Sequence, residues 1–213
     1  MDAKEMLSGA GVVPVIVIDD VSKAVPLARA LVDGGLNVLE VTFRTQCAAE
    51  AIAKIRAEVP EAVAGAGTIL DAEQLQAAKA AGARFCVAPG FVPETVRAAI
   101  AADMPFCPGV ATASELSQAL ALGCRMVKFF PAESAGGAKY IKDLLGAFRW
   151  TGVGFMPTGG VNPANLKTYL SIPEVVCCGG TWIAPKDAVA SGDWARIAAL
   201  AAEAKKLAAE SRG

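Results

Sequence analysis

Residues 105–131, PFCPGVATASELSQALALGCRMVKFFP, hold one full copy of the pattern that decides the fold. Two short apolar runs, Pro105 to Val110 and Met126 to Pro131, flank a segment of helical period. A Thr-x-x-Glu capping box begins that segment at Thr112, and Gly123 stands where the helix should end. The order strand, helix, strand predicts two parallel strands joined by a crossover helix.

The same alternation continues along the chain and predicts eight strands. They are Val12 to Ile18, Asn37 to Phe43, Ala62 to Thr68, Phe85 to Gly90, Pro105 to Val110, Met126 to Pro131, Gly154 to Gly160 and Val175 to Thr181. Eight units in 213 residues leave about 27 residues each, which is what a strand and helix with short loops need. We therefore expect an α/β fold, a single (β/α)₈ TIM barrel domain over residues 1–213.

An open doubly wound sheet is the rival arrangement. It is disfavoured because the first strand is followed by Ile18-Asp19-Asp20 and not by a G-x-G-x-x-G fingerprint. A helix from Asp2 to Leu7 is expected to cap the barrel bottom, and a long helix from Asp193 to Glu210 to close the last unit.

The composition excludes several classes of function. The chain has 20 basic and 21 acidic residues, so it lacks the electrostatic footprint of a protein that binds nucleic acid or an anionic membrane. It has no histidine, which removes imidazole metal sites and Ser-His or Cys-His nucleophiles. Its six cysteines form no C-x-x-C pair, as in a reducing compartment. Without an apolar run long enough to span a bilayer, we expect a cytoplasmic protein.

Polar side chains near the carboxyl ends of barrel strands are candidate site residues. Lys128 lies between Val127 and Phe129 in the sixth predicted strand, where an ammonium has to be desolvated. Desolvation favours the neutral amine, a nucleophile toward carbonyls. Glu40 also interrupts an apolar strand, at an inward position, and a carboxylate beside such an amine could carry protons. The alternatives are a Lys128 that extends to solvent and a Glu40 that only neutralises it.

The remaining strand ends favour an anionic ligand. Arg44 has the planar fork that suits a carboxylate, although such an arginine can also be a plain surface residue. Gly159 with Gly160, and Gly179 with Gly180, end the seventh and eighth predicted strands, where barrels bind phosphate through backbone N–H groups. One glycine pair alone would indicate a tight turn, whereas two pairs on these consecutive strands favour a phosphate cradle.

Eight strings follow one another along the chain: VVPVIVI, LEVTFRT, VAGAGTIL, APG, PGVATASE, KFFPAE, PTGGVNPAN and GGTW. In these strings and their order the chain resembles the 2-keto-3-deoxy-6-phosphogluconate (KDPG) aldolase family, which includes 4-hydroxy-2-oxoglutarate (KHG) aldolases. The resemblance implies a class I aldolase of the Entner–Doudoroff pathway, a homotrimer of barrels that cleaves a phosphorylated 2-keto-3-deoxy sugar acid to pyruvate and glyceraldehyde 3-phosphate. No metal or organic cofactor is implied.

The resemblance also implies roles for single residues. Lys128 in KFFPAE matches the Schiff-base lysine, and Glu40 in LEVTFRT matches the general acid/base. Arg44 and Thr68 match positions that hold the pyruvyl carboxylate, and Pro89 lines the site. The other matches are a substrate contact, Thr158, and the phosphate end, Gly159, Gly160, Gly179, Gly180 and Thr181.

Four positions depart from the commonest family pattern and leave fine specificity open. Thr181 replaces a frequent serine but keeps the hydroxyl, Ala88 a serine or threonine, Ala111 a serine, and Phe43 a leucine. An aldolase for the galactonate epimer is therefore the first alternative. A cofactor-free sugar-phosphate isomerase or epimerase, and a non-catalytic barrel that binds phosphosugars, are the more remote ones.

Overall fold

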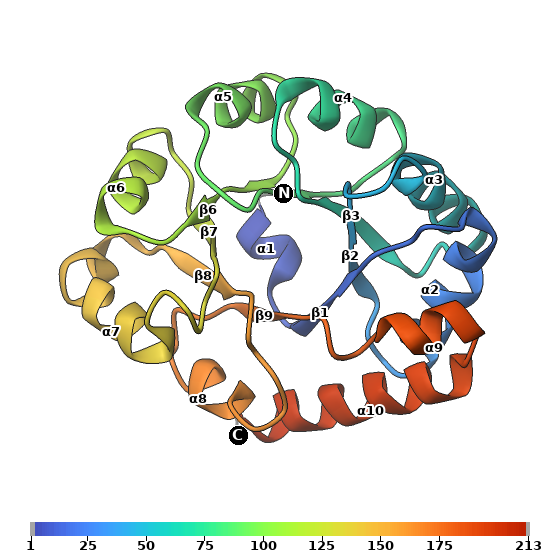
Figure 1. Cartoon of the computed structure of the whole chain (residues 1–213). Helices are drawn as coiled ribbons and strands as arrows, with labels where there is room; N and C mark the ends of the chain where they lie inside the picture. The colour runs from blue at the N-terminus through green and yellow to red at the C-terminus, as the bar shows by residue number, and fades with distance from the viewer. Residues whose placement is uncertain (1–2, 212–213) are drawn as a thin grey trace.

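The computed structural model describes residues 3–211, in which a curled parallel sheet is surrounded by helices (Figure 1). The strands are β1 (Gly11–Ile16), β2 (Val38–Thr42), β3 (Val63–Gly67), β4 (Cys86–Val87), β5 (Phe106–Cys107), β6 (Gly109–Val110), β7 (Met126–Phe129), β8 (Gly154–Pro157) and β9 (Cys177–Gly180). The helices are α1 (Ala3–Leu7), α2 (Ala24–Asp33), α3 (Ala48–Glu58), α4 (Ala72–Ala80), α5 (Pro93–Ala101), α6 (Ala113–Ala121), α7 (Gly137–Phe148), α8 (Leu166–Leu170), α9 (Lys186–Ser191) and α10 (Trp194–Glu210), with 3₁₀ turns at Val21–Lys23 and Arg149–Thr151.

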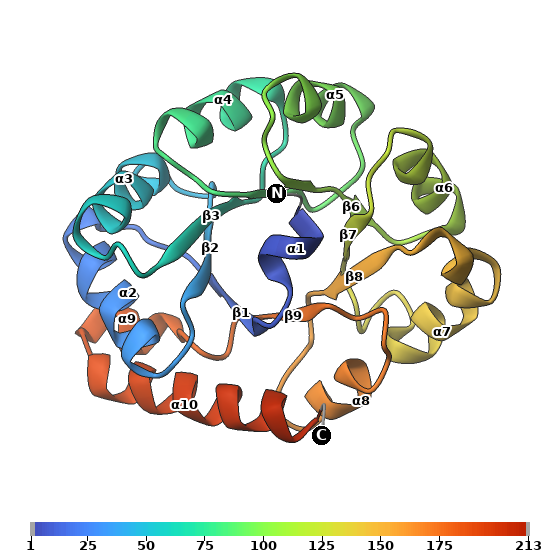
Figure 2. The ribbon, with the colours of Figure 1, turned by 180° about the vertical axis from the view of Figure 1, so that it is seen from behind.

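The strands pair in two groups, and all the pairings are parallel. Six strands follow the order β5-β4-β3-β2-β1-β9, and three follow the order β6-β7-β8. Two isolated parallel bridges, Phe155 with Val175 and Thr158 with Gly179, join β8 to β9. In Figures 1 and 2, α2 to α10 lie outside the curled sheet and α1 lies within its curve.

The fifth predicted strand is wrong as a continuous element. It consists of β5, which pairs with β4, and β6, which pairs with β7. Pro108 separates them, and its carbonyl accepts a hydrogen bond from the Lys128 amide at 2.8 Å. Proline has no N–H to donate to a ladder, so the chain leaves one group of strands and joins the other at this residue.

Several strands also end earlier than predicted. Thr68, Gly159 and Gly160 have φ values of 60°, 97° and 82°, and all three lie beyond the strands to which the prediction assigned them. A left-handed φ is incompatible with an extended strand. These residues therefore belong to the loops that follow β3 and β8.

Alternate residues of each strand contribute to two different hydrophobic clusters. Val38 and Met126 belong to an inner cluster, whereas Leu39 and Val127 belong to the larger cluster beneath the outer helices. A period of two is expected for strands that are covered on both faces. It places Glu40, between Leu39 and Val41, on the inner face.

The amino-terminal helix packs against the inner cluster. Ala3 and Leu7 of α1 are buried there, and Lys4 Nζ donates to the Gly152 carbonyl at 2.7 Å. The predicted helix is confirmed from Ala3 onward, and Asp2 lies outside the described residues.

The capping box predicted at Thr112 is confirmed, and two further helices have side-chain N-caps. Thr112 and Glu115 form a reciprocal capping box at α6, and Asp193 caps α10. Asp71 accepts from the Gln74 amide, but Gln74 Oε1 accepts from the amide of Leu70 rather than from Asp71.

No helix among residues 3–211 is long and apolar enough to cross a membrane.

Two glycines should respond to alanine with opposite signs. A Cβ on Gly65 would lie inside 3.0 Å of the buried Phe85 ring, whereas a Cβ on Gly146, in helix α7, would meet nothing within 4 Å. We expect Gly65→Ala to lower the free energy of unfolding by about 1–3 kcal/mol through overpacking. Gly146→Ala should raise it by about 0.5–1 kcal/mol because alanine is the better helix former. Urea unfolding at matched m-values measures both changes, and equal stability of the two variants would contradict this account.

Candidate active site

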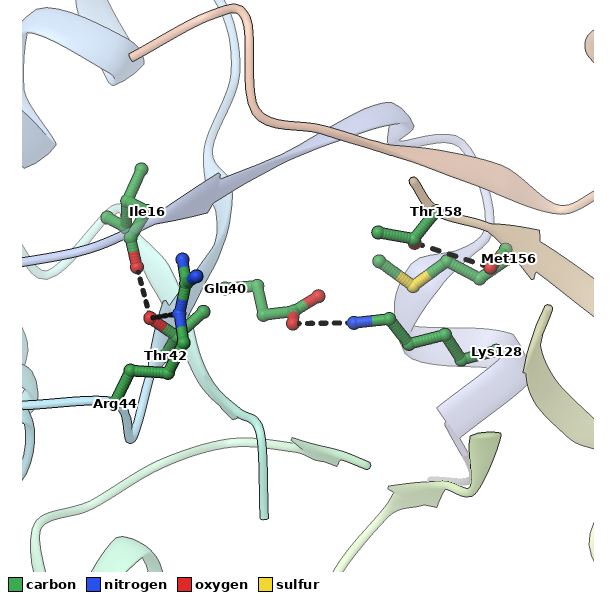
Figure 3. A network of polar contacts seen from close by, with 7 residues as sticks. All are labelled: Ile16, Glu40, Thr42, Arg44, Lys128, Met156 and Thr158. Atoms are coloured by element: carbon green, nitrogen blue, oxygen red, sulfur yellow. Dashed lines mark hydrogen bonds and ion pairs between the residues drawn. The ribbon is translucent and has the colours of Figure 1, made fainter. Parts of the chain in front are cut away.

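A buried ion pair spans the interior of the curled sheet. Lys128 Nζ on β7 lies 3.1 Å from Glu40 Oε1 on β2. Lys128 is 4% exposed and Glu40 is 0% exposed. Figure 3 shows the two side chains pointing toward each other, with Thr42 and Arg44 on the side of Glu40, and Met156 and Thr158 on the side of Lys128. The inward direction predicted for Glu40 is confirmed, and Lys128 points inward as well.

Small inner residues make room for this pair. A Cβ on Gly67 would lie within 3.0 Å of three atoms of the Glu40 carboxyl end, and Gly109 is the register partner of Lys128 on β6. A Cβ on Gly109 would collide with the Pro89 backbone. Because Gly67 carries no side chain, the Glu40 carboxylate has room beside β3 to reach Lys128, whereas Gly109 leaves room for the Pro89 backbone.

The carboxylate of Glu40 is only half satisfied. Its Oε1 accepts from Lys128, whereas Oε2 is buried and has no hydrogen-bond partner among the described residues. Buried carboxylate oxygens nearly always have a donor, so Oε2 is open to a proton or to a hydroxyl of a bound molecule. On the other side, Lys128 Nζ lies 5.4 Å from the centroid of the Phe130 ring, within range of a cation–π contact.

The neighbouring thiols are poor candidates for the same chemistry. Burial raises the pKa of the Cys107 thiol well above its ordinary value, with a smaller contribution from Cys177. Burial also raises the pKa of Cys86 to about 12. A thiol nucleophile acts as the thiolate, so both cysteines stay protonated and unreactive at neutral pH.

The predicted carboxylate-binding residues lie near the ends of the strands, at the mouth of the site. Arg44 is exposed just beyond β2, and its Nε lies 3.3 Å from Thr42 Oγ1. Thr42 in turn donates to the Ile16 carbonyl at 3.0 Å. Thr68 and Pro89 follow β3 and β4, and both are half-buried. The structure shows no direct contact of Arg44 with the ion pair in residues 3–211, so the fixed positive charge stands apart from the buried one.

The predicted phosphate end gathers at β8 and β9. Thr158 is buried, and a Cβ on Gly179 would collide with its hydroxyl. Gly180 ends β9, and the exposed Thr181 follows it. Gly159 and Gly160 form the adjacent loop. Their left-handed φ values correct the view that they end a strand, and they favour a loop whose amides can face a ligand.

Sequence reasoning missed the residues that support this arrangement. Gly67 belongs to a quoted string, but hydropathy says nothing about the carboxylate it accommodates. Phe130 and Glu133 lie in the string KFFPAE, and interpreting the end of that string as a loop over the site would have identified both as site residues. No sequence signal indicates that Glu133 accepts a hydrogen bond from the hydroxyl of Tyr169, which lies on helix α8.

The geometry is suited to reactions at a carbonyl. A lysine held in a dry interior can add to a ketone, and an adjacent carboxylate with a free oxygen can move protons. No group of three or more Cys, Asp or Glu side chains within residues 3–211 is arranged to hold a metal ion.

Comparison with known proteins identifies close relatives along almost the whole chain. The family model for KDPG and KHG aldolase matches residues 3–200. The KHG/KDPG aldolase of Escherichia coli (strain K12) is 47% identical over 202 residues, which cover 95% of this chain and 94% of that protein.

Two solved structures share the fold. KDPG aldolase from Legionella pneumophila, with pyruvate captured at low pH as a covalent carbinolamine intermediate, has a TM-score of 0.91 at 40% identity, covering 95% of this chain and 97% of that one. The KDPG aldolase of Zymomonas mobilis ZM4 with 3-phosphoglycerate has a TM-score of 0.89 at 46% identity, covering 96% of this chain and 95% of that one.

Proposed function

Because this chain belongs to the KDPG and KHG aldolase family, we propose that it cleaves KDPG to pyruvate and glyceraldehyde 3-phosphate at the Lys128–Glu40 pair. The chain is a lyase of the Schiff-base type, like the relative that holds pyruvate as a covalent carbinolamine. The observation that carries the assignment is a lysine amine 3.1 Å from a fully buried carboxylate whose second oxygen has no partner.

The reaction begins when the Lys128 ammonium passes a proton to Glu40 and the resulting neutral amine adds to the C2 ketone of the substrate. Glu40 returns this proton to the hydroxyl of the carbinolamine. The carbinolamine loses water and becomes a protonated imine. Glu40 takes the proton of the C4 hydroxyl as the C3–C4 bond breaks, and the electrons of that bond flow to the imine nitrogen as an enamine. The aldehyde leaves, the enamine is protonated at C3, and hydrolysis releases pyruvate and the free lysine.

Glu40 is suited to these proton transfers by its two unlike oxygens. Oε1 is held by the Lys128 ammonium, while the unpartnered Oε2 is free to exchange protons with a water or a substrate hydroxyl. The imine supplies the electrophilic stabilisation that a metal would otherwise give, so the proposed reaction needs no metal or organic cofactor.

The fixed charges of the substrate are assigned to the rim. Arg44 and Thr68 hold the pyruvyl carboxylate, Pro89 lines the site, and Thr158 contacts the substrate. The phosphate lies against the backbone of the two loops at the ends of β8 and β9: Gly159, Gly160, Gly179, Gly180 and Thr181. Support comes from the exposed guanidinium of Arg44 on one side of the ion pair and the glycine-rich loops on the other.

The finer architecture is also part of this proposal. We infer one closed (β/α)₈ barrel domain over residues 1–213, with α1 as its lower cap. The bridges between β8 and β9 and the inner packing of Leu7 support it. We also infer a place in the Entner–Doudoroff pathway and in the cytoplasm, in line with the resemblance.

Trapping the imine tests the assignment of Lys128. Borohydride added in the presence of pyruvate should leave a reduced pyruvyl group on Lys128, as measured by peptide mass spectrometry. Lys128→Met should abolish both labelling and cleavage, whereas Lys139→Met, at an exposed helical position, should change neither. Glu40→Gln should lower kcat by about 10²–10⁴-fold, the usual contribution of a general acid or base. Labelling of another lysine, or turnover of a phosphosugar without any labelling, would contradict the proposal.

Steady-state kinetics rank the substrates. We expect the largest kcat/KM with KDPG, and a lower value with KHG, because KHG lacks the phosphate for which the β8 and β9 loops are suited. The galactonate epimer differs only in configuration, so Phe43, Ala88 and Ala111 decide its rank. A higher kcat/KM for the epimer than for KDPG would reassign the substrate.

We infer a homotrimer from the family resemblance. Exposed apolar side chains, among them Trp150 at 87% and Ile100 at 61%, offer surface that neighbours could cover. Sedimentation equilibrium should give a mass three times the 21.7 kDa of one chain. A mass near that of one chain at micromolar concentration would refute the trimer.

A further inference from the structure

The loop after β7 and the loop after β8 are joined beyond the ends of their strands. The Ala132 amide donates to the Thr158 carbonyl at 2.8 Å, and the Glu133 amide donates to the Gly159 carbonyl at 3.0 Å. The first loop follows the strand that carries Lys128. The second belongs to the proposed phosphate end, so these two hydrogen bonds connect both parts of the site.

A third carbonyl of the same loop is held by two asparagines. Asn162 Nδ2 and Asn165 Nδ2 donate to the Gly160 carbonyl at 3.1 Å and 3.0 Å. The asparagines are themselves fixed, because Asn165 Oδ1 accepts from the Asn162 amide at 2.8 Å and Asn162 Oδ1 accepts from the Ala164 amide at 2.9 Å. The carbonyls of residues 158, 159 and 160 therefore all have assigned donors.

Holding these carbonyls also fixes the amides of the same peptide groups. In a trans peptide the N–H points away from the C=O, so the amides of Gly159, Gly160 and Val161 point away from the groups that hold the carbonyls. Within residues 3–211, the Gly160 and Val161 amides donate to no protein acceptor. Consecutive amides with left-handed glycines form the type of concave donor set that binds anions.

The side chain of Glu133 packs against the loop that contains Gly159 and Gly160. A Cβ on Gly160 would lie 2.5 Å from Glu133 Cγ, so the side chain passes directly against the Gly160 backbone. Its Oε1 accepts a hydrogen bond from the hydroxyl of Tyr169, which is 1% exposed on helix α8. Burial, and then the hydrogen bond to Glu133, raise the pKa of Tyr169, so this hydroxyl remains a donor throughout the physiological range.

We propose that Glu133, held by Tyr169, and the pair Asn162 and Asn165 are positioning residues that preset the amides of Gly160 and Val161 for the substrate's phosphate. This inference rests on the function proposed above. An amide set that is already aligned binds the phosphate without the cost of ordering a glycine loop, which is the usual effect of preorganisation. Losing the alignment should weaken binding of phosphorylated ligands and leave the chemistry at Lys128 intact.

The experiment compares a ligand that has a phosphate with one that has none. For each variant we would measure KM and kcat with KDPG, inhibition by inorganic phosphate, and deuterium exchange at the pyruvate methyl group by NMR. Exchange reports formation of the imine and enamine at Lys128 with no phosphate involved. It therefore separates a failure of this inference from a failure of the proposed function.

Tyr169→Phe removes the hydroxyl and keeps the ring. We expect the KM for KDPG and the inhibition constant for phosphate to rise by about tenfold, the effect of losing one hydrogen bond to a charged group. The rate of pyruvate exchange should stay within about twofold of the parent. Glu133→Ala should behave like Tyr169→Phe, and the double variant should be no worse than either, because the two residues act as one unit.

Two variants serve as matched controls. Glu133→Gln keeps an acceptor for Tyr169 and should restore a KM near that of the parent. Tyr140→Phe removes the hydroxyl of a half-buried tyrosine that packs beside Phe129, and it should leave every readout unchanged. If Tyr169→Phe fails to fold, Asn165→Ala tests the loop from its other side and must produce the same selective rise.

The inference is overturned by either of two results. Equal losses in KDPG cleavage and pyruvate exchange would make Glu133 and Tyr169 merely structural. Unchanged values in Tyr169→Phe and Glu133→Ala would show that the loop needs no such support. If the parent protein does not exchange the methyl protons of pyruvate, the proposed function is wrong, whatever the variants show.

Discussion

The ion pair between Lys128 and Glu40 is the constraint on which the rest of the structure depends. Two charges in an apolar interior are costly unless they are close together and hydrogen-bonded, and their separation here is 3.1 Å. A curled sheet satisfies this requirement because it directs side chains from β2 and β7 into one enclosed space (Figure 3). Removing either partner would leave the other charge buried and alone, so the pair holds the two groups of strands in their relative positions.

The size of the neighbouring residues follows from this pair. Glu40 reaches Lys128 only because Gly67 presents no side chain to its carboxyl group. Two residues earlier on β2 and β7, the inner positions are filled by Val38 and Met126, which belong to the inner cluster. The interior is therefore densely packed near α1 and opened by glycines toward the carboxyl ends of the strands.

The sequence predicted the parts of this arrangement that depend on strand periodicity. Lys128 and Glu40 both interrupt apolar runs, Glu40 at an inward position, and that pattern was sufficient to place both in one site. The hydropathy pattern does not indicate backbone conformation. Thr68 and Gly160 were assigned to strands although their φ values are positive, and Pro108 was included in a strand that it divides. Contacts between distant side chains were invisible as well, since Glu133 and Tyr169 are 36 residues apart and share no pattern.

The distribution of burial separates two electrostatic tasks in the proposed reaction. Lys128, Glu40 and Thr158 are almost inaccessible to water, whereas Arg44 and Thr181 are exposed at the rim. The charges that change during imine formation and bond cleavage lie where the low dielectric strengthens their interaction with fixed partners. The phosphate of the substrate keeps its charge throughout, and at the rim it can keep part of its hydration, so binding it there avoids most of the desolvation cost of a fully buried anion. Joining the loops after β7 and β8 keeps these two regions at a fixed separation, and in the proposed reaction a substrate held at its phosphate end then presents C2 to the amine of Lys128.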